Sequence, residues 1–324
     1  MRRLFALAFA LAAWFSAGDA FVVHAQTRVT LKSATAGSSY YLMMVQLGEA
    51  LKTASLGQLS PTIEESQGSV QNVKEAARRA GNFVFTTPPG LLADARDGKP
   101  PFAGESGYDA IRSLFPIPGI TMHWVVRADA GVQSLADLAG KDFIAGGRGT
   151  AGQRLTAAAL TALGLDGKVR LIDTELGSAP GAVRNKQVVG YGTAATHPSP
   201  QVQELAATAP IRLLGLSADE LAKVRAIDAS SAPITIPKGT YAGVDYDVVT
   251  LAIPVAAYAT MRMDDASAHA VTKAFWEQRE ALAKQNPWWG GVARELLATL
   301  GAKLHAGALR YYQEAGIAVP DALR

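Results

Sequence analysis

The sequence predicts an α/β protein of two lobes, each a mostly parallel sheet flanked by helices, joined by a hinge. Three observations carry this prediction: the chain has 324 residues, it contains no cysteine, and strand-like segments alternate with helix-like segments. A chain of this length favours two lobes over one. Without cysteine there is no disulfide, so the core alone must hold the fold. Strands separated by helices are typical of parallel sheets, whose ligand sites lie at the carboxyl ends of the strands.

The first 25 residues have the form of a secretory signal peptide. Two arginines precede an apolar run over 4–15, and the segment closes with Val23-His24-Ala25. The apolar run is shorter than the roughly 20 residues that a membrane-spanning helix needs. We expect cleavage after Ala25, with cleavage after Ala20 as the alternative, and therefore an exported protein.

Composition excludes several classes of function. The formal net charge is only +3, and the basic residues are scattered, so nothing favours a nucleic-acid partner. The absence of cysteine excludes a thiolate nucleophile and a cysteine metal site. The histidines that follow the signal peptide are too far apart for a His-x-x-x-His zinc pair, and we expect neither a metal nor a cofactor. These histidines are His123, His197, His269 and His305.

The hydrophobic pattern places the elements in order. The expected strands are 28–34, 62–66, 82–87, 121–128, 141–146, 168–173, 188–193, 211–216 and 248–257. The expected helices are 38–54, 69–80 with Ser69 as its cap, a short one opened by a capping box at Ser134, one ending near Leu163, and a helical end over 264–316. The Pro- and Gly-rich segment 88–107 is expected to be a loop.

Three loops share one kind of chemistry, because each leads from a strand into a helix and carries glycine and hydroxyl residues. They are 34–40, 66–72 and 146–150. Backbone N–H groups at a helix N-terminus lack intrahelical partners, and the helix dipole adds about half a positive charge, so an anion fits there. The alternatives are ordinary ones: a serine that only caps a helix, glycines that only permit turns, and an arginine that is only solvated.

We expect these loops to face one another across a cleft that holds the ligand. Arg148 could grip a carboxylate with two parallel hydrogen bonds. The candidates are Ser38, Ser39 and Tyr40 of the first loop, Gln67, Ser69 and Asn72 of the second, and Arg148, Gly149 and Thr150 of the third. Further candidates at strand ends are Thr86, Thr87, Tyr191 and Thr193.

The third loop also matches a nucleotide-binding pattern. Gly147, Gly149 and Gly152 fit G-x-G-x-x-G, and Asp173 follows about 20 residues later. In a dinucleotide domain this loop usually belongs to the first strand–helix unit, whereas here it lies in mid-chain. We therefore disfavour an NAD-dependent dehydrogenase. The sequence also lacks a G-x-S-x-G elbow, so this motif gives no indication of a hydrolase.

The amino-acid sequences of these loops and of several other segments resemble one family, the TAXI-type solute receptors of TRAP transporters. The resemblance covers essentially all of the chain after residue 25. It rests on TLKSATAGSSYY (30–41), GSVQN (68–72), MHWVVRADAGVQSLADLAGK (122–141) and IPKGTYAGVDYDVVTLAIP (236–254). The segment LHAGALRYYQEAG (304–316) is the most specific. Arg148 departs from the pattern, because the family usually has serine there.

The resemblance implies a two-lobed periplasmic binding fold, type II-like, that closes around a small organic anion or amino acid. It implies a location in the periplasm, an integral membrane TRAP permease as partner, and no catalysis. We place lobe I at 26–126 plus 236–324 and lobe II at 127–235. An ABC-type or sensor-coupled receptor and an exported enzyme on a similar fold are the alternatives.

Overall fold

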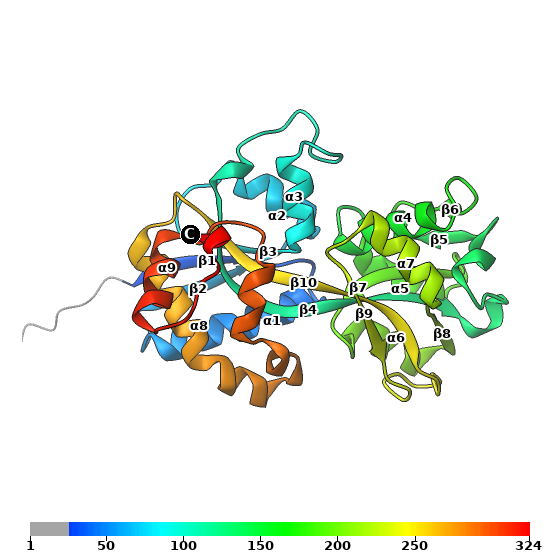
Figure 1. The fold of residues 1–324 in the computed structure, drawn as a ribbon. Coiled ribbons are helices and arrows are strands. Elements are labelled where there is room, and N and C mark those ends of the chain that lie inside the picture. Colours follow the sequence, from blue (N-terminus) through cyan, green and yellow to red (C-terminus); the bar gives the residue numbers. More distant parts are fainter. Residues whose placement is uncertain (1–25) are drawn as a thin grey trace, which may run out of the picture.

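Two groups of elements are joined by two long strands, β4 (Ile111–Arg127) and β10 (Val248–Thr260), which cross the middle of the molecule (Figure 1). The computed structural model describes residues 26–324. The predicted signal peptide lies outside the described residues. The two-lobed α/β architecture that the sequence predicts is confirmed.

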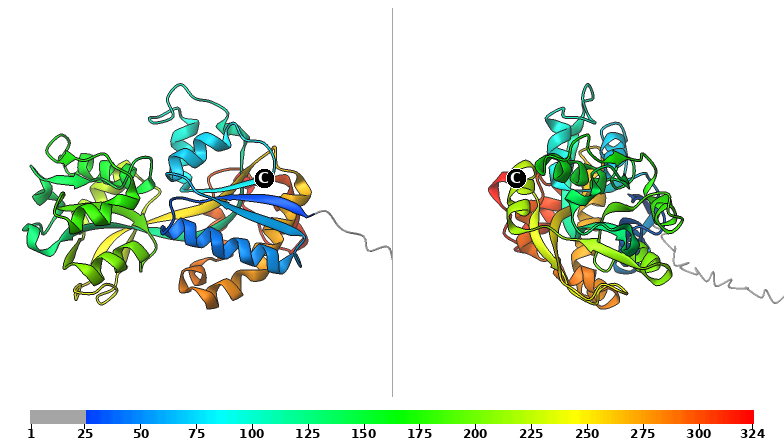
Figure 2. Two further views of the ribbon diagram at one scale, coloured as in Figure 1. Left: turned by 180° about the vertical axis from the view of Figure 1, so that it is seen from behind. Right: turned by 90° about the vertical axis from the view of Figure 1, so that its right-hand side faces the viewer.

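Lobe I carries both ends of the described chain and is seen from behind in Figure 2. Its strands lie in the order β2-β1-β3-β10-β4, in which β1 is parallel to β2 and β3, and β10 is antiparallel to β3. Its elements are β1 (Thr27–Lys32), α1 (Ser39–Ala54), β2 (Leu59–Glu64), α2 (Ser69–Ala76), β3 (Phe83–Thr87), α3 (Pro89–Arg96), α8 (Asp265–Gln285) and α9 (Ala306–Glu314).

Lobe II contains the middle of the chain. Its strands β5 and β6 are parallel, as are β5 and β7, whereas β7 and β8 pair antiparallel with β4, and β9 pairs antiparallel with β10. Its elements are β5 (Asp142–Ile144), α4 (Ala151–Ala162), β6 (Arg170–Leu171), α5 (Ala179–Arg184), β7 (Gly190–Ala195), α6 (Pro200–Thr208), β8 (Ile211–Leu214), α7 (Ala218–Ile227) and β9 (Ala232–Ile236).

Short 3-10 helices fill several connections. They are η1 (Tyr108–Ala110), η2 (Ala128–Ala130), η3 (Leu135–Leu138), η4 (Leu176–Ser178), η5 (Pro287–Gly291), η6 (Arg294–Thr299) and η7 (Asp321–Leu323). The capping box predicted at Ser134 is present at the start of η3, with Asp137 as its second member. Asp137 therefore has a structural role in holding the first turn.

Each lobe buries helices against its sheet. In α1, Met43, Leu47 and Leu51 repeat every four residues and are fully buried, so this face packs inward. The α8 helix is held to the sheet by Phe275, whose ring stacks on Phe115 of β4 at 4.0 Å between centroids. The buried face of α1 fixes this helix against the sheet, and its N-terminus borders the site.

The two crossing strands are interrupted at the same level. Pairing between β10 and β4 shifts register between Ile253 and Val255. Pro254 lies in that shift and Pro118 lies opposite it, and a proline cannot donate to the ladder. The lobe boundaries stay a prediction; this weak point supports a proposal that the hinge lies here, inside both strands.

Three expectations about elements are wrong. The segment 88–107 is not all loop, because α3 begins at Pro89, a residue type well suited to the first turn of a helix. Ser69 does not cap α2; the cap position belongs to Gly68, and no side chain caps that helix. The expected strand 168–173 shrinks to Arg170–Leu171.

Candidate functional site

A small cavity lies between the lobes where α1, α2 and α4 begin and β7 ends. We call it the helix-terminal cavity, and its volume is about 30 Å³. Space of that size holds one or two water-sized groups, so the lobes are closed on each other here. Six predicted residues line it, namely Ser38, Ser39, Tyr40, Ser69, Thr150 and Thr193.

Local sequence explains why these three helices start at the cavity. Ser38 caps α1 by accepting a hydrogen bond from Tyr41 N, and Thr150 caps α4 by accepting one from Gln153 N. Gly68 precedes α2 with a φ of 130°, a conformation that favours glycine. No side chain caps α2, and in its first turn Val70 N donates to Gly149 O of lobe II, so the start of α2 lies against lobe II beside the cavity.

Two buried hydroxyls in the cavity wall make no hydrogen bond within residues 26–324. They are Tyr40 Oη and Ser69 Oγ, whose residues are 7% and 1% exposed. Burial raises the pKa of Tyr40 well above its ordinary value, and a hydrogen-bonding interaction with the adjacent Ser69 hydroxyl opposes the shift only in part. The two oxygens do not meet the geometry of a full hydrogen bond. The phenol is therefore neutral, and both hydroxyls can donate to an acceptor in the cavity.

Unpaired buried polar atoms cost free energy and are rare in folded proteins. In the described part of the chain, six side-chain atoms of this kind occur, and five belong to predicted site residues. Those five residues are Tyr40, Ser69, Asn72, Thr86 and Tyr191. Only Tyr40 and Ser69 of these five line the helix-terminal cavity, so these two hydroxyls are the ones placed to bond a ligand there.

Asn72 acts one layer behind the cavity wall. Its amide Nδ2 donates to Ser33 O at 2.8 Å and to Thr86 O at 3.1 Å. These two carbonyls lie at the ends of β1 and β3, so Asn72 ties the first turn of α2 to both strands. Its role is to position Ser69 and the α2 terminus.

The lobes touch through backbone and hydroxyl contacts beside the cavity. Val70 N donates to Gly149 O at 3.1 Å. Thr196 N donates to Ser39 Oγ at 3.1 Å, and the two hydroxyl oxygens lie 2.9 Å apart. Because Thr196 Oγ1 donates to Pro198 O, the Ser39 hydroxyl is the donor to Thr196. Ser39 is thus already engaged in holding the lobes together.

A charged pair also joins the lobes. Arg154 of α4 places Nε 2.7 Å from Asp94 of α3, while its Nη1 lies 3.2 Å from Asp228. Asp228 is almost fully buried and accepts from the Ser230 hydroxyl at 2.6 Å. Lobe II therefore holds the guanidinium in place, and Asp94 of lobe I receives it when the lobes close.

Arg148 lies outside the helix-terminal cavity. Its side chain is 69% exposed and forms an ion pair with Asp173, with Nη2 to Oδ2 at 2.8 Å. It lines an outer groove of about 500 Å³ together with Gln67 and Gly149. The acidic residue of the G-x-G-x-x-G pattern is therefore the partner of Arg148.

The remaining candidates lie deeper than the cavity wall. Thr86, Thr87 and Tyr191 are fully buried. Thr87 Oγ1 reaches Pro88 O at 3.5 Å, a long contact. Burial raises the pKa of Tyr191, which packs in the core of lobe II. None of these three side chains lines the cavity among the described residues.

Sequence reasoning found Thr150 and Thr193 but missed other residues of the lobe II wall. Gly152, Ala194, Ala195 and Gln201 line the cavity, and Thr196 binds Ser39. A Cβ on Gly152 would lie 2.9 Å from Ala194 N, so only glycine lets α4 pack this closely on β7. The signal was available in Pro200, a helix-opening residue after a strand, but the α6 helix was not expected.

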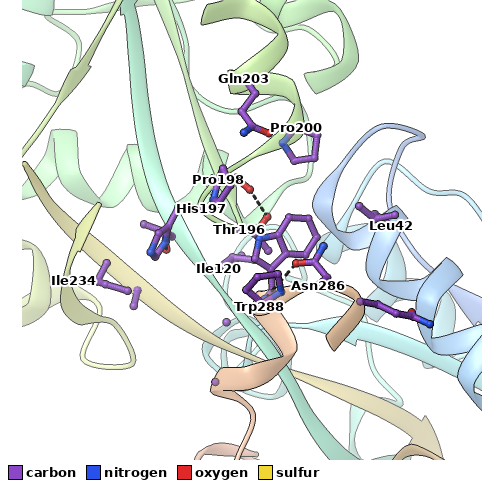
Figure 3. Close-up of a pocket in the computed structure, with 16 residues that line it drawn as sticks. Leu42, Ile120, Thr196, His197, Pro198, Pro200, Gln203, Ile234, Asn286 and Trp288 are labelled. Atoms are coloured by element: carbon purple, nitrogen blue, oxygen red, sulfur yellow. Dashed lines mark hydrogen bonds between the residues drawn. The ribbon is translucent and has the colours of Figure 1, made fainter. Parts of the chain in front are cut away.

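A second and larger cavity lies beside the crossing strands (Figure 3). We call it the hinge-side cavity; its volume is about 660 Å³, and Ile120, Ala252 and Trp288 are among its lining residues. Size alone would favour it as the ligand site. The α6 helix begins at Pro200 in its wall, but none of its lining residues within 26–324 has an unpaired buried hydroxyl, whereas two line the smaller cavity, where three helices begin.

Within residues 26–324, no group of three or more His, Cys, Asp or Glu side chains is arranged to hold a metal ion. Over the same residues, no helix has both the length and the apolar character that a bilayer crossing requires.

Comparison with solved structures identifies the fold. The periplasmic binding protein BugD is 12% identical, with coverage of 90% of this chain and 99% of that chain and a TM-score of 0.58. MatC from Rhodopseudomonas palustris with bound malate is 14% identical, with coverage of 89% and 97% and a TM-score of 0.59. R. palustris Rpa4515 with adipate is 16% identical, with coverage of 91% and 99% and a TM-score of 0.56.

The family is given by the sequence itself. Residues 31–316 match the profile of the NMT1-like family, which is nearly the whole described chain. The cavity between two lobes, the crossing strands and the three solved structures agree with one architecture. The chain therefore belongs to the NMT1-like family and has the fold of the periplasmic binding proteins.

Proposed function

We propose that this protein captures a small organic anion between its lobes in the periplasm and delivers it to a membrane transporter. The observation that carries the proposal is the convergence of three helix N-termini on one cavity whose wall holds two buried, unpaired hydroxyls. Helix dipoles and O–H donors both favour a carboxylate over a neutral group. MatC with malate and Rpa4515 with adipate, which share the fold, carry carboxylate ligands.

The capture mechanism follows from the hinge and the contacts between the lobes. A ligand that touches both lobes binds the closed state better, and so shifts the population toward closure. Tyr40 and Ser69 would receive the anion on lobe I. The start of α4 and the Arg154–Asp94 pair would complete closure from lobe II.

The hydroxyls provide the sharpest test. Tyr40→Phe and Ser69→Ala each remove an unpaired buried group, so the free energy of unfolding without ligand should stay unchanged or rise by about 1–2 kcal/mol. Affinity for the anion should fall more than tenfold. Tyr312→Phe is the matched control: Tyr312 Oη donates to Leu114 O at 2.8 Å, so its loss should destabilise the fold and spare affinity.

Ligand screening by thermal shift tests the anion itself. Amino acids, dicarboxylates, 2-oxoacids and aromatic acids are compared with their amides, since a ligand that binds only the folded state raises the melting temperature. Acids should raise the Tm and the matching amides should not. Equal shifts from acids and amides would contradict the proposal, as would acids that bind Tyr40→Phe and Ser69→Ala as tightly as the original protein.

For the partner, we propose a TRAP-type permease, on the TAXI-like motifs at 30–41 and 304–316. Reconstitution of the protein with a fused many-helix permease in vesicles tests this. Uptake driven by an ion gradient is expected. Uptake that requires ATP would point to an ABC-type transporter, and would leave the anion-binding proposal intact.

A further inference from the structure

The hinge-side cavity is uncharged throughout. None of its sixteen lining residues is Asp, Glu, Lys or Arg. Its volume of about 660 Å³ falls in the range of roughly 300–1,000 Å³ that small-molecule sites occupy. A charged group would gain no partner there and would lose its hydration, so the chemistry of the cavity suits an uncharged group.

An aromatic side chain dominates the cavity. Trp288 of η5 is only partly buried, and its indole stands among the lining residues in Figure 3, whereas its neighbour Trp289 is fully buried and donates to Gln46 Oε1. Leu42 of α1 and Ile234 of β9 add apolar surface from lobe I and lobe II. A planar apolar group can stack on a half-exposed indole.

A neutral histidine supplies the one titratable group in the wall. His197 Nδ1 lies 2.7 Å from Thr121 Oγ1, and burial lowers the pKa of His197 below its ordinary value. The ring is therefore uncharged at neutral pH. It adds hydrogen-bonding capacity without attracting an anion into this cavity.

A thin partition separates the hinge-side cavity from the helix-terminal cavity. Ser39 lines the helix-terminal cavity, Thr196 lines the hinge-side cavity, and their hydroxyls bond each other at 2.9 Å. The helix-terminal cavity of about 30 Å³ has room for little more than the charged end of a solute. Any larger body needs space elsewhere, and the hinge-side cavity lies directly beyond this hydrogen bond.

We propose that the solute is an aryl or cyclic monocarboxylate that occupies both cavities. This deepens the proposed function and rests on it. The carboxylate lies at the N-termini of α1, α2 and α4, and the uncharged ring lies on Trp288 in the hinge-side cavity. The Ser39–Thr196 hydrogen bond gives way, and the freed Ser39 hydroxyl donates to the carboxylate, while Thr196 Oγ1 keeps its bond to Pro198 O.

Isothermal titration with defined probes tests the proposal. Benzoate, phenylacetate and 3-phenylpropionate place a ring at increasing distance from the carboxylate. Acetate and succinate lack the ring, and phenylacetamide lacks the charge. At least one aryl acid should bind tenfold or more tighter than acetate and succinate. Trp288→Ala and Ile234→Ala should each weaken binding of the aryl acid at least fivefold and leave acetate binding unchanged. Trp288→Phe should keep most of the affinity for the aryl acid.

The controls separate this inference from the proposed function. Ile227→Ala changes an exposed residue and should alter nothing. If no aryl acid binds tighter than acetate and succinate, or if both cavity variants bind aryl acids normally, the inference is overturned and the anion site stands. If acids bind no better than phenylacetamide, the anion site falls, and the inference falls with it.

Discussion

The two lobes contribute differently to the helix-terminal cavity. The lobe I wall contains the unpaired hydroxyls of Tyr40 and Ser69, whereas the lobe II wall contains Thr150, whose hydroxyl is occupied as the cap of α4. Lobe II also holds Arg154 in place with the buried Asp228. Lobe I therefore supplies the two buried unpaired hydroxyls, whereas Thr150 and Arg154 of lobe II already have partners.

This difference suggests an order of events. Free donors on lobe I can engage an anion while the cleft is open, because they need no rearrangement of their own partners. Lobe II then contributes the start of α4 and the guanidinium of Arg154, which Asp228 already holds in place. Both strengthen the closed state. The predictions below test this division of roles between the lobes, from the largest expected effect to the smallest.

Acid should weaken lobe II before lobe I. His123, on the lobe II half of β4, is fully buried; its Nδ1 donates to Thr121 O, so its Nε2 accepts from Tyr241. Burial lowers the pKa of His123 from 6.5 to about 4. Between these values the unfolded chain binds a proton that the folded chain refuses, so stability is full above pH 6.5 and falls by about 3 kcal/mol by pH 4.

Denaturant unfolding between pH 7 and pH 4 measures this loss. His197 and His305 also have pKa values lowered by burial. The informative quantity is therefore the slope of the free energy of unfolding against pH, compared between the original protein and His123→Asn. For His123→Asn, this slope should be smaller by the contribution of about one bound proton. In lobe I, paired Arg79 and Lys32 lower the pKa of Glu64 to about 2, so that contribution is lost only below about pH 4.5. Equal slopes for both proteins would refute the role of His123.

Asn72→Ala should weaken the lobe I wall from behind. The change removes the donor to two buried carbonyls, Ser33 O and Thr86 O, and should lower the free energy of unfolding by about 2 kcal/mol. Anion affinity should fall as well, because Ser69 loses its support. Asn185→Ala, at an exposed position, is the matched control. A change below about 0.5 kcal/mol in unfolding would show that α2 does not depend on this amide.

Asp94→Asn tests the lobe II guanidinium. Arg154 keeps Asp228, so the fold should be little changed, but the closed state loses its charged contact between lobes. We expect a roughly threefold to fivefold loss of affinity, in the range of a partly buried pair, carried by faster release of the anion. Asp97→Asn, at the residue that follows α3, where the side chain is 57% exposed, is the control. Unchanged release rates would exclude the pair as a closing contact.

Sequence reasoning succeeded where the signal was local. Ser38 and Thr150 were predictable as residues at helix starts, since capping depends on a few adjacent residues. The α3 helix was missed because proline and glycine in 88–107 suggested a loop. Only the second half of β4 was predicted, as 121–128, because Pro116, Pro118 and Gly119 interrupt the pattern of its first half. These residues are tolerated at the interrupted crossing of two strands, which is a tertiary feature.

The site was harder to predict than the fold. The unpaired state of Tyr40 and Ser69 depends on neighbours that come from distant parts of the chain. The Ser39–Thr196 contact joins residues 157 positions apart in the sequence, and no local sequence pattern predicts it. The sequence motif therefore locates the loops, but only the packed structure tells which side chains remain free.

Arg148→Ala should have the smallest effect, and it tests the expectation that sequence alone favoured. In the closed structure the guanidinium is exposed and paired with Asp173, on the outer side of the loop. Exposed pairs of this kind contribute little, so anion affinity measured by titration should change less than about twofold. Asp173→Asn should behave alike. A loss above tenfold for Arg148→Ala alone would mean that Arg148 leaves Asp173 and grips the anion, which would move a free charge to the lobe II wall and reverse the comparison.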